Sequence, residues 1–251
     1  MIRERTLEYY LAALLQGDRK ACRTVIEGTL QSGTPANSVY VDVIWPIMVE
    51  IERLLRADRI TPTQEHLATR INRTLVDQLQ NKLPRRPIKN KKTVICCAQD
   101  ELQELGAQMM TDLFESDGWE VRFLGGGLTN DDILAFINEY APDILLIYGT
   151  APKQAPDVRR LIDTIRTINA WPDMRIMVSG GVFNRAEGLW QEIDADLCAG
   201  TAVEAVQVAS SDHQIAAEPG AINSPYDEKR AANRRKKRQR NIAKDVPVQI
   251  T

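Results

Sequence analysis

The chain has 251 residues, of which 43% are hydrophobic and 26% charged, and its formal net charge is −2. This composition is that of a soluble protein with room for one large domain or two modest ones. No stretch reaches the roughly 18–20 uninterrupted apolar residues that a membrane-spanning helix needs. The first ten residues, MIRERTLEYY, also lack the apolar core of a signal peptide. We therefore expect a cytoplasmic protein with no membrane contact.

Residues 1–83 predict a bundle of four amphipathic helices. Apolar residues recur at helical spacing in four segments that are separated by short breaks. The third segment contains Pro46, where we expect a local kink. The fourth opens with Thr61 and Pro62, a typical N-cap followed by proline at the first helical position. Four such helices with short connections indicate a small bundle.

From Lys92 the hydrophobic period changes. The proline-rich and basic residues 84–91, PRRPIKNK, predict a linker. After it, short apolar runs rich in β-branched residues alternate about five times with helix-like segments, which indicates a parallel sheet covered on both faces. We therefore expect an α/β fold: a four-helix bundle, then a doubly wound five-stranded parallel sheet of the Rossmann or flavodoxin type over 92–217. The expected helices of this second domain cover 102–117, 130–141, 152–169, 185–193 and roughly 201–216.

The C-terminal part, residues 218–251, is polar and charged, and we expect it to be disordered. Residues 229–240, KRAANRRKKRQR, carry eight basic residues and no acidic one, so the rest of the chain has a net charge of −2 − 8 = −10. This basic run has two interpretations. It contacts nucleic acid phosphates, with binding that weakens steeply with salt and without stacking aromatics, or it is a solvated tail that touches the acidic body or an acidic partner.

The cysteines and histidines do not form a recognisable metal site. No two cysteines have the C-x-x-C spacing of zinc or redox pairs, and two histidines are too few for a multi-histidine centre. We expect reduced, mostly buried thiols, with Cys96 and Cys97 on opposite faces of one strand. His213, near the end of the last helix, is expected at the surface. The two other cysteines are Cys22 and Cys198, and the other histidine is His66.

In a doubly wound sheet, the loops at the carboxyl ends of the strands form the binding crevice. Three loops stand out: AQDELQELG after the first strand, IYGTAPKQ after the third and VSGGVFN after the fourth. Paired glycines let a backbone pass close to a ligand, although a tight turn explains each cluster equally well. In the first loop, Glu101 and Glu104 fit the stabilisation of a helix N-terminus better than an acid/base pair.

The order and spacing of these loops resemble the cobalamin-binding domain of methionine synthases, mutases, corrinoid methyl-carrier proteins and light-responsive cobalamin regulators. The family pattern is an acidic residue, x, His, x, x, Gly, then Ser-x-Leu or Ser-x-Thr, then Gly-Gly. The helical bundle resembles the cap that precedes this domain, and the resemblance spans about residues 7–216. The matching positions are Glu101, Gln103 and Gly106, then Tyr148 and Thr150, then Gly180 and Gly181, and in the cap Glu65 and His66.

Three positions depart from the family. The resemblance implies a histidine as lower axial cobalt ligand where this chain has Gln103, whose amide is a poor donor to cobalt. The serine that lines the family's nucleotide-tail slot is Tyr148, a bulkier side chain that fills part of the slot. The tryptophan that packs over the cofactor in the photoregulators is Leu55, and Trp45 lies ten residues too early. His66 is either an upper-face contact to the cofactor or an interface histidine.

The resemblance leaves three functions open. The first is a non-catalytic sensory module that holds cobalamin or another tetrapyrrole, a bilin included, between cap and sheet, with photoreception as one form. Its cap movement would act on a partner protein or on a second copy of the chain. The second is a cofactor-free platform for protein interactions. The third is a corrinoid methyl carrier, against which Gln103 counts. The chain carries no nucleophile motif, zinc cluster or phosphate-binding loop, so we do not expect an enzyme.

Overall fold

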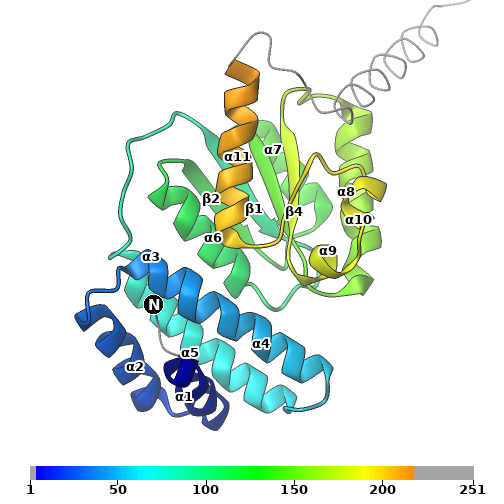
Figure 1. Cartoon of the computed structure of the whole chain (residues 1–251). Helices are drawn as coiled ribbons and strands as arrows, with labels where there is room; N and C mark the ends of the chain where they lie inside the picture. Colours follow the sequence, from blue (N-terminus) through cyan, green and yellow to red (C-terminus); the bar gives the residue numbers. More distant parts are fainter. Residues whose placement is uncertain (1–3, 218–251) are drawn as a thin grey trace, which may run out of the picture. The chain divides into compact units, whose positions relative to one another are not determined.

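The computed structural model describes residues 4–217 of the chain (Figure 1). The chain divides into two compact units, Met1–Ala209 and Ser210–Thr251, and the helical bundle and the sheet both lie within the first. Residues 210–217 continue the last helix. The predictions for the tail 218–251, its basic run 229–240 and the side chain of His213 lie outside the described part of the structure.

The N-terminal region consists of four helical segments, as predicted. They are α1 (Glu4–Gln16), α2 (Arg19–Gln31), the continuous run α3 (Ala36–Val39), η1 (Tyr40–Ile44) and α4 (Trp45–Arg56), and α5 (Pro62–Gln80).

Two local predictions for these helices can be compared with the structure. The irregularity expected at Pro46 is the π-helical turn η1 just before α4, in which the Trp45 N–H bonds the carbonyl of Tyr40. Proline has no N–H for an α-helical bond, so a widened turn in front of it is accommodated. The N-cap expected at Thr61 is confirmed, because Thr61 and Gln64 form a reciprocal capping box.

The second region is built on a five-stranded sheet in which every neighbouring pair is parallel, and this confirms the predicted fold class. The strand order is β2-β1-β3-β4-β5. The register pairs Cys97 with Tyr148, and Tyr148 with Ser179, so the carboxyl ends of the central strands lie side by side. The strands are β1 (Lys92–Cys97), β2 (Glu120–Gly125), β3 (Ile144–Tyr148), β4 (Arg175–Ser179) and β5 (Leu197–Ala199).

Helices cover both faces of this sheet (Figure 1). The core on one face joins the sheet to the N-terminal bundle and to α6 and α11, and the core on the other face contains α7 and α8. Cys97 belongs to the first core and Cys96 to the second, as the strand alternation predicted. The helices and 3-10 turn are α6 (Leu105–Ser116), α7 (Asn130–Tyr140), η2 (Pro152–Gln154), α8 (Ala155–Ile168), α9 (Gly181–Arg185), α10 (Leu189–Glu192) and α11 (Ala202–Ala217).

Two predicted helix boundaries were wrong. The helix expected from residue 102 begins at Leu105, because the preceding loop is held by side-chain hydrogen bonds and Asp100 adopts a positive φ of 61°. The helix expected over 185–193 is shorter: α9 ends at Arg185, and α10 begins only at Leu189, after Gly188 with a φ of 80°. A positive φ does not continue an α-helix.

The predicted linker, residues 84–91, lies against the carboxyl end of α6. Arg86 and Lys89 both pair with the buried carboxylate of Asp117. The backbone N–H groups of Arg86 and Lys89 donate to the carbonyls of Ser116 and Gly118, each at 2.8 Å. These bonds fix the connection between the bundle and β1. Within residues 4–217, no helix has the length and apolar character that crossing a membrane requires.

Candidate functional site

A cavity of about 160 Å³ lies between the N-terminal bundle and the carboxyl ends of the strands. Helix α4 supplies an apolar wall made of Trp45, Met48 and Val49, and half of the Val49 side chain remains exposed (52%). The opposite wall comes from the loops after β1, β3 and β4. The polar and glycine residues around the cavity are Glu52, Arg56, Glu65, Thr69, Gln103, Gly106, Tyr148, Gly180, Gly181, Asn184, Arg185 and Gly200.

The cavity lies at the edge of the sheet where this fold class binds ligands. With the order β2-β1-β3-β4-β5, β1 leads to α6 on one face and β3 leads to α8 on the other. The connections therefore diverge between β1 and β3, and a crevice opens at such a switch point. In this chain, the loops after β1 and β3 form the two sides of that crevice.

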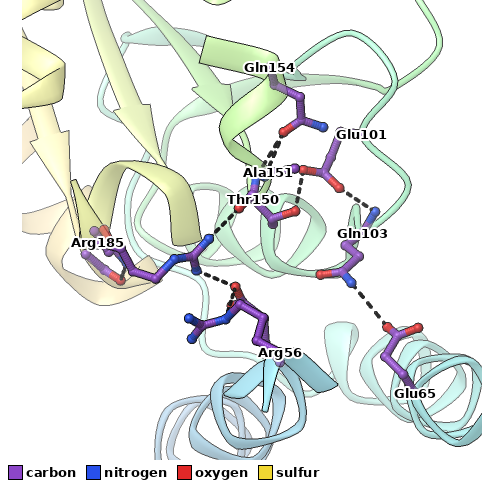
Figure 2. A network of polar contacts seen from close by, with 11 residues as sticks. Arg56, Glu65, Glu101, Gln103, Thr150, Ala151, Gln154 and Arg185 are labelled. Carbon is purple, nitrogen blue, oxygen red and sulfur yellow. Dashed lines mark hydrogen bonds and ion pairs between the residues drawn. The ribbon is translucent and has the colours of Figure 1, made fainter. Parts of the chain in front are cut away.

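The carboxylate of Glu101 bridges this crevice. Glu101 is buried (5% exposed) and its Oε2 accepts hydrogen bonds from the N–H and the hydroxyl of Thr150, at 2.7 and 2.8 Å. Its Oε1 accepts from the N–H of Gln103 at 2.8 Å. Figure 2 shows these bonds, together with Gln154, whose Oε1 accepts from the N–H groups of Thr150 and Ala151. Glu101 thus joins two loops. The predicted role, stabilisation of the N-terminus of α6, is not the one that the structure gives it.

Glu104 also has a different role from the one predicted. Its side chain does not cap α6; it accepts from Arg73 of α5 at 2.9 Å and from the N–H of Gly126 at 2.6 Å. Burial opposes the charged form, but these two donors and the charge of Arg73 lower the pKa of Glu104 below its usual value. Glu104 is therefore a charged contact between α5 and the loops of the α/β domain.

Gln103 points toward the bundle. Its Nε2 lies 3.5 Å from the Oε1 of Glu65 on α5, a long hydrogen bond across the cavity (Figure 2). Glu65 is itself buried, and the same oxygen accepts from the Thr69 hydroxyl at 2.8 Å. The side chain at the centre of the first motif therefore connects a strand loop to the bundle.

A second contact closes the other side of the cavity. Arg185 of α9 pairs through its Nη1 with Glu52 of α4, and its Nη2 donates to the carbonyl of Thr150 at 2.7 Å. Arg56 lies 3.5 Å from the same Glu52 carboxylate. We call the two pairs Gln103–Glu65 and Arg185–Glu52 the cap latch, because they join the bundle to the α/β domain across the cavity.

Tyr148 fills the space beneath the cavity. Its side chain is 6% exposed and lies over Gly106 in the first turn of α6, where a Cβ would be 2.6 Å from the ring Cζ. Real Cβ atoms do not approach so closely, so glycine is required at position 106 as long as the tyrosine keeps this place. Burial raises the pKa of Tyr148 above its ordinary value, and the phenol therefore stays neutral.

The two glycines of the third motif have different surroundings. Gly180 has a φ of 103°, and a Cβ there would lie 2.9 Å from the carbonyl carbon of Gly149 and closer still to its oxygen. Gly181 begins α9, and its Cβ would meet the side-chain ends of Glu52 and Arg185. The first glycine is required by the backbone, whereas the second leaves room for the cap latch.

Gly181→Ala is therefore expected to loosen the Arg185–Glu52 pair without disturbing the backbone. An added Cβ would lie 2.7 Å from the Glu52 Oε1, a flexible side-chain end that can move. Since a partly exposed ion pair stabilises a fold by only about 0.2–1 kcal/mol, the melting temperature should change little. Amide hydrogen exchange in α4 should become faster, and unchanged exchange there would show that the pair does not hold the helix.

The structure brings six of the ten predicted site residues to the cavity. Leu55 and His66 do not line it, and the His66 side chain is 69% exposed, 3.8 Å from the carboxylate of Glu65. Glu101 and Thr150 lie behind the cavity wall, where they bond each other. The six at the cavity are Glu65, Gln103, Gly106, Tyr148, Gly180 and Gly181.

Sequence reasoning missed the α4 face and Arg185. Trp45, set aside as ten residues too early, lines the cavity. A signal was present, because Trp45, Met48, Val49, Glu52 and Arg56 recur at the spacing of one helix face. Arg185 had no comparable signal. Among the described residues, no group of three or more His, Cys, Asp or Glu side chains is placed to hold a metal ion.

Comparison with known proteins gives two family matches. Two family models, each described as a B12 binding domain, match residues 91–209 and residues 6–80. No curated protein matches the chain.

Solved structures give a match in fold. The monomethylamine corrinoid protein of Methanosarcina barkeri is similar over 83% of this chain and 98% of its own, with 17% identity and a TM-score of 0.72. A cobalamin-binding protein from Desulfitobacterium hafniense DCB-2 shares 18% identity over 84% of this chain and 98% of its own, with a TM-score of 0.46. The first of these likenesses covers the bundle and the sheet together and concerns their fold.

Proposed function

The chain belongs to the B12-binding domain family, and from this premise we propose that it is a non-catalytic regulatory module whose bundle acts as a cap over a bound corrinoid. The corrinoid binds between α4 and α5 and the carboxyl ends of the strands. Cobalt receives no lower ligand from the first motif, so cobalamin keeps its own base or has an open lower face. Movement of the cap then carries the signal to a partner protein.

The observation that carries this proposal is the hydrogen bond of the Gln103 amide to the cap. A primary amide has no nitrogen lone pair to offer, and its oxygen is a poor donor to cobalt. In this chain, the Gln103 amide donates instead to Glu65 on the cap. The residue at the family's ligand position thus contributes to cap closure, which is the part of a sensor that has to respond to the ligand.

The size of the cavity supports a link between binding and cap movement. Pockets for drug-sized ligands measure roughly 300–1,000 Å³, and a corrinoid is larger than those ligands, whereas this cavity is about 160 Å³. The residues therefore fit a corrinoid only when the cap moves away from the strand loops. Such movement breaks the cap latch. Binding of the corrinoid is therefore coupled to the equilibrium between the closed and open positions of the cap.

The wall of α4 suits a flat macrocycle. Trp45, Met48 and Val49 present apolar surface to the cavity, and Val49 is 52% exposed although it lies on a helix that packs in a core. A corrin ring or another tetrapyrrole would cover this surface. A light-sensitive ligand on cobalt, or a bilin in the same place, would make the module a photoreceptor.

A second function, a cofactor-free platform for protein partners, has one observation in its favour. The Tyr148 ring, the Glu101 bridge and the cap latch leave little open space at the site. A methyl carrier is less well supported, because that chemistry normally uses the histidine that Gln103 replaces.

The test is to mix the purified chain separately with hydroxocobalamin, adenosylcobalamin and biliverdin, remove free ligand by desalting, and record the absorption spectrum. We expect a retained corrinoid spectrum with bands showing that cobalamin's own base stays on cobalt. Val49→Arg places a charge on the apolar wall and should abolish retention. Ile168→Arg on α8 is the matched control, since Ile168 is also 52% exposed and does not line the cavity.

The outcomes separate the candidates. A retained bilin spectrum would identify the ligand as a bilin. A colourless chain with all three compounds would contradict the proposal and favour the interaction platform. Equal retention by Val49→Arg and Ile168→Arg would place the ligand somewhere other than this cavity.

A further inference from the structure

The crevice between β1 and β3, where this fold class admits the deepest part of a ligand, is closed in this chain. We infer that Tyr148 is a specificity-determining residue that prevents insertion of a corrinoid's nucleotide tail, so that the chain recognises the ring alone. The ligand class is then every corrinoid, including those with another lower base or with none. This inference rests on the proposed function and deepens it.

The first closure is the Tyr148 ring. Tyr148 is the last residue of β3 and is paired with Cys97 of β1 and Ser179 of β4, so its side chain starts at the centre of the sheet edge. The ring reaches the first turn of α6, where a Cβ on Gly106 would lie 2.6 Å from Cζ and 3.0 Å from Cε2. The space between the end of β3 and the start of α6 is therefore occupied by aromatic carbon.

The second closure is the Glu101 carboxylate. It bonds both the N–H and the hydroxyl of Thr150, and so ties the β1 loop to the β3 loop directly across the crevice. Because Glu101 is 5% exposed, separating these loops would leave a buried charge without its partners, which is strongly unfavourable. An inserted group would have to displace both the ring and this bridge.

What remains open is the cavity on the cap side. On the α4 side, the apolar residues Trp45, Met48 and Val49 lie beside Glu52 and Arg56. The strand side includes four glycines among its lining residues: Gly106, Gly180, Gly181 and Gly200. The apolar residues and the glycines offer surface to the face of a ring, whereas the Tyr148 ring and the Glu101 bridge occupy the crevice between β1 and β3. The binding free energy should therefore come from the macrocycle and depend little on the nucleotide tail and its base.

Affinity measurements with two corrinoids test this inference. Hydroxocobalamin carries the nucleotide tail, and aquocobinamide has the same ring without it. We expect the full chain to bind the two with dissociation constants within about threefold of each other, whereas contact with the tail would favour cobalamin by about tenfold or more. A preference of that size for cobalamin in the unaltered chain would overturn the inference.

Substitutions at Tyr148 identify the side chain responsible. Tyr148→Ser opens the space above Gly106 and should make cobalamin bind at least about tenfold tighter than cobinamide. Tyr148→Phe keeps the ring and is the matched control, with the two affinities still equal. If the serine variant does not fold, Tyr148→Thr replaces it, since a β-branched residue suits the strand. An unchanged ratio in the folded variant would overturn the inference.

Failure of the proposed function gives a distinct result. If the unaltered chain binds neither corrinoid, the regulatory module is contradicted, and the variants still decide the role of Tyr148. A folded serine or threonine variant that gains cobalamin binding would show that the tyrosine blocks the slot. A folded variant that still binds neither corrinoid would overturn the inference as well.

Discussion

Gly180→Ala should lower the free energy of unfolding by about 3 kcal/mol. Gly180 has a φ of 103° and a ψ of 172°, a region that is essentially restricted to glycine and that costs other residues about 1–3 kcal/mol. An added Cβ would also lie 2.9 Å from the backbone carbonyl carbon of Gly149. Because backbone on both sides is held by strand pairing and by the Gly149 N–H bond to Ser179, neither partner can move away cheaply.

Chemical denaturation followed by circular dichroism measures this loss. Gly28→Ala is the matched control: Gly28 is an exposed residue inside α2, its φ is negative and no atom lies within 4 Å of an added Cβ. That substitution should stabilise the chain by about 0.5–1 kcal/mol, since alanine has the higher helix propensity. If both variants unfold at the same denaturant concentration, the backbone requirement at Gly180 is refuted.

The second large effect concerns the pH dependence of stability, through Asp112 on α6. Asp112 is 3% exposed at the contact between α6 and the cap, where the hydroxyl of Tyr40 lies 2.8 Å from its Oδ2. Burial is the main cause that raises the pKa of Asp112 to about 6. The negative charges of Glu115 and Asp77 raise this pKa further, and the hydrogen bond from Tyr40 lowers it.

The hydrogen bonds around Tyr40 can also accommodate the protonated acid. The Tyr40 hydroxyl lies within bonding distance of two acceptors, Asp112 and the carbonyl of Val76 at 3.0 Å. One hydroxyl donates only one proton. When Asp112 is protonated, its O–H donates to Tyr40 and Tyr40 donates to Val76, so that every group has a partner.

The direction of the pH effect follows from the raised pKa. Between the unfolded value of about 4 and the folded value of about 6, the folded state holds more protons than the unfolded state. The stabilising contribution of Asp112 to the free energy of unfolding is therefore fully present below about pH 4. It is lost as the pH rises through about 6. A shift of about two pKa units corresponds to at most about 3 kcal/mol.

Asp112→Asn keeps an acceptor for Tyr40 and removes the titration. We expect this variant to be more stable than the unaltered chain at pH 7–8, by up to about 2–3 kcal/mol. The stability difference should shrink steadily as the pH falls from 7 to 4. Denaturant titrations at several pH values measure it, with the exposed Asp131 on α7, changed to Asn, as the control for loss of one charge. A difference that is constant from pH 4 to 7 would contradict the assignment.

Both effects bear on the proposed regulation, because they act on contacts between the cap and the α/β domain. Gly180 precedes α9, which carries Arg185 to Glu52. Asp112 contacts Tyr40 of the π-helical turn η1, the segment that leads into the apolar wall on α4. The position of α4 over the cavity is therefore set from both ends, and a ligand that moves it acts against defined contacts.

The sequence by itself determined the class of fold and the positions of the motifs. Short apolar runs rich in β-branched residues and the period of 3.6 in the helices are local properties, so the five strands, the helical bundle and the capping box at Thr61 were predictable. The poor donor character of the Gln103 amide toward cobalt also needed no structure, since it is a property of the side chain itself. The start of α6 at Leu105 was missed, because the preceding loop is held by bonds between Glu101 and Thr150, which lies in the loop after β3.

Only the tertiary structure decided what these residues do together. That Glu101 bridges to Thr150, that Gln103 reaches Glu65 and that Arg185 reaches Glu52 depends on elements 38 to 133 residues apart in the chain. No local pattern encodes such distances, because they follow from how the bundle packs against the sheet. The same packing turned His66 toward solvent and placed Trp45 at the cavity. The type of a residue determines which interactions its side chain can make. The packing of elements that are distant in the chain determines which partners that side chain meets.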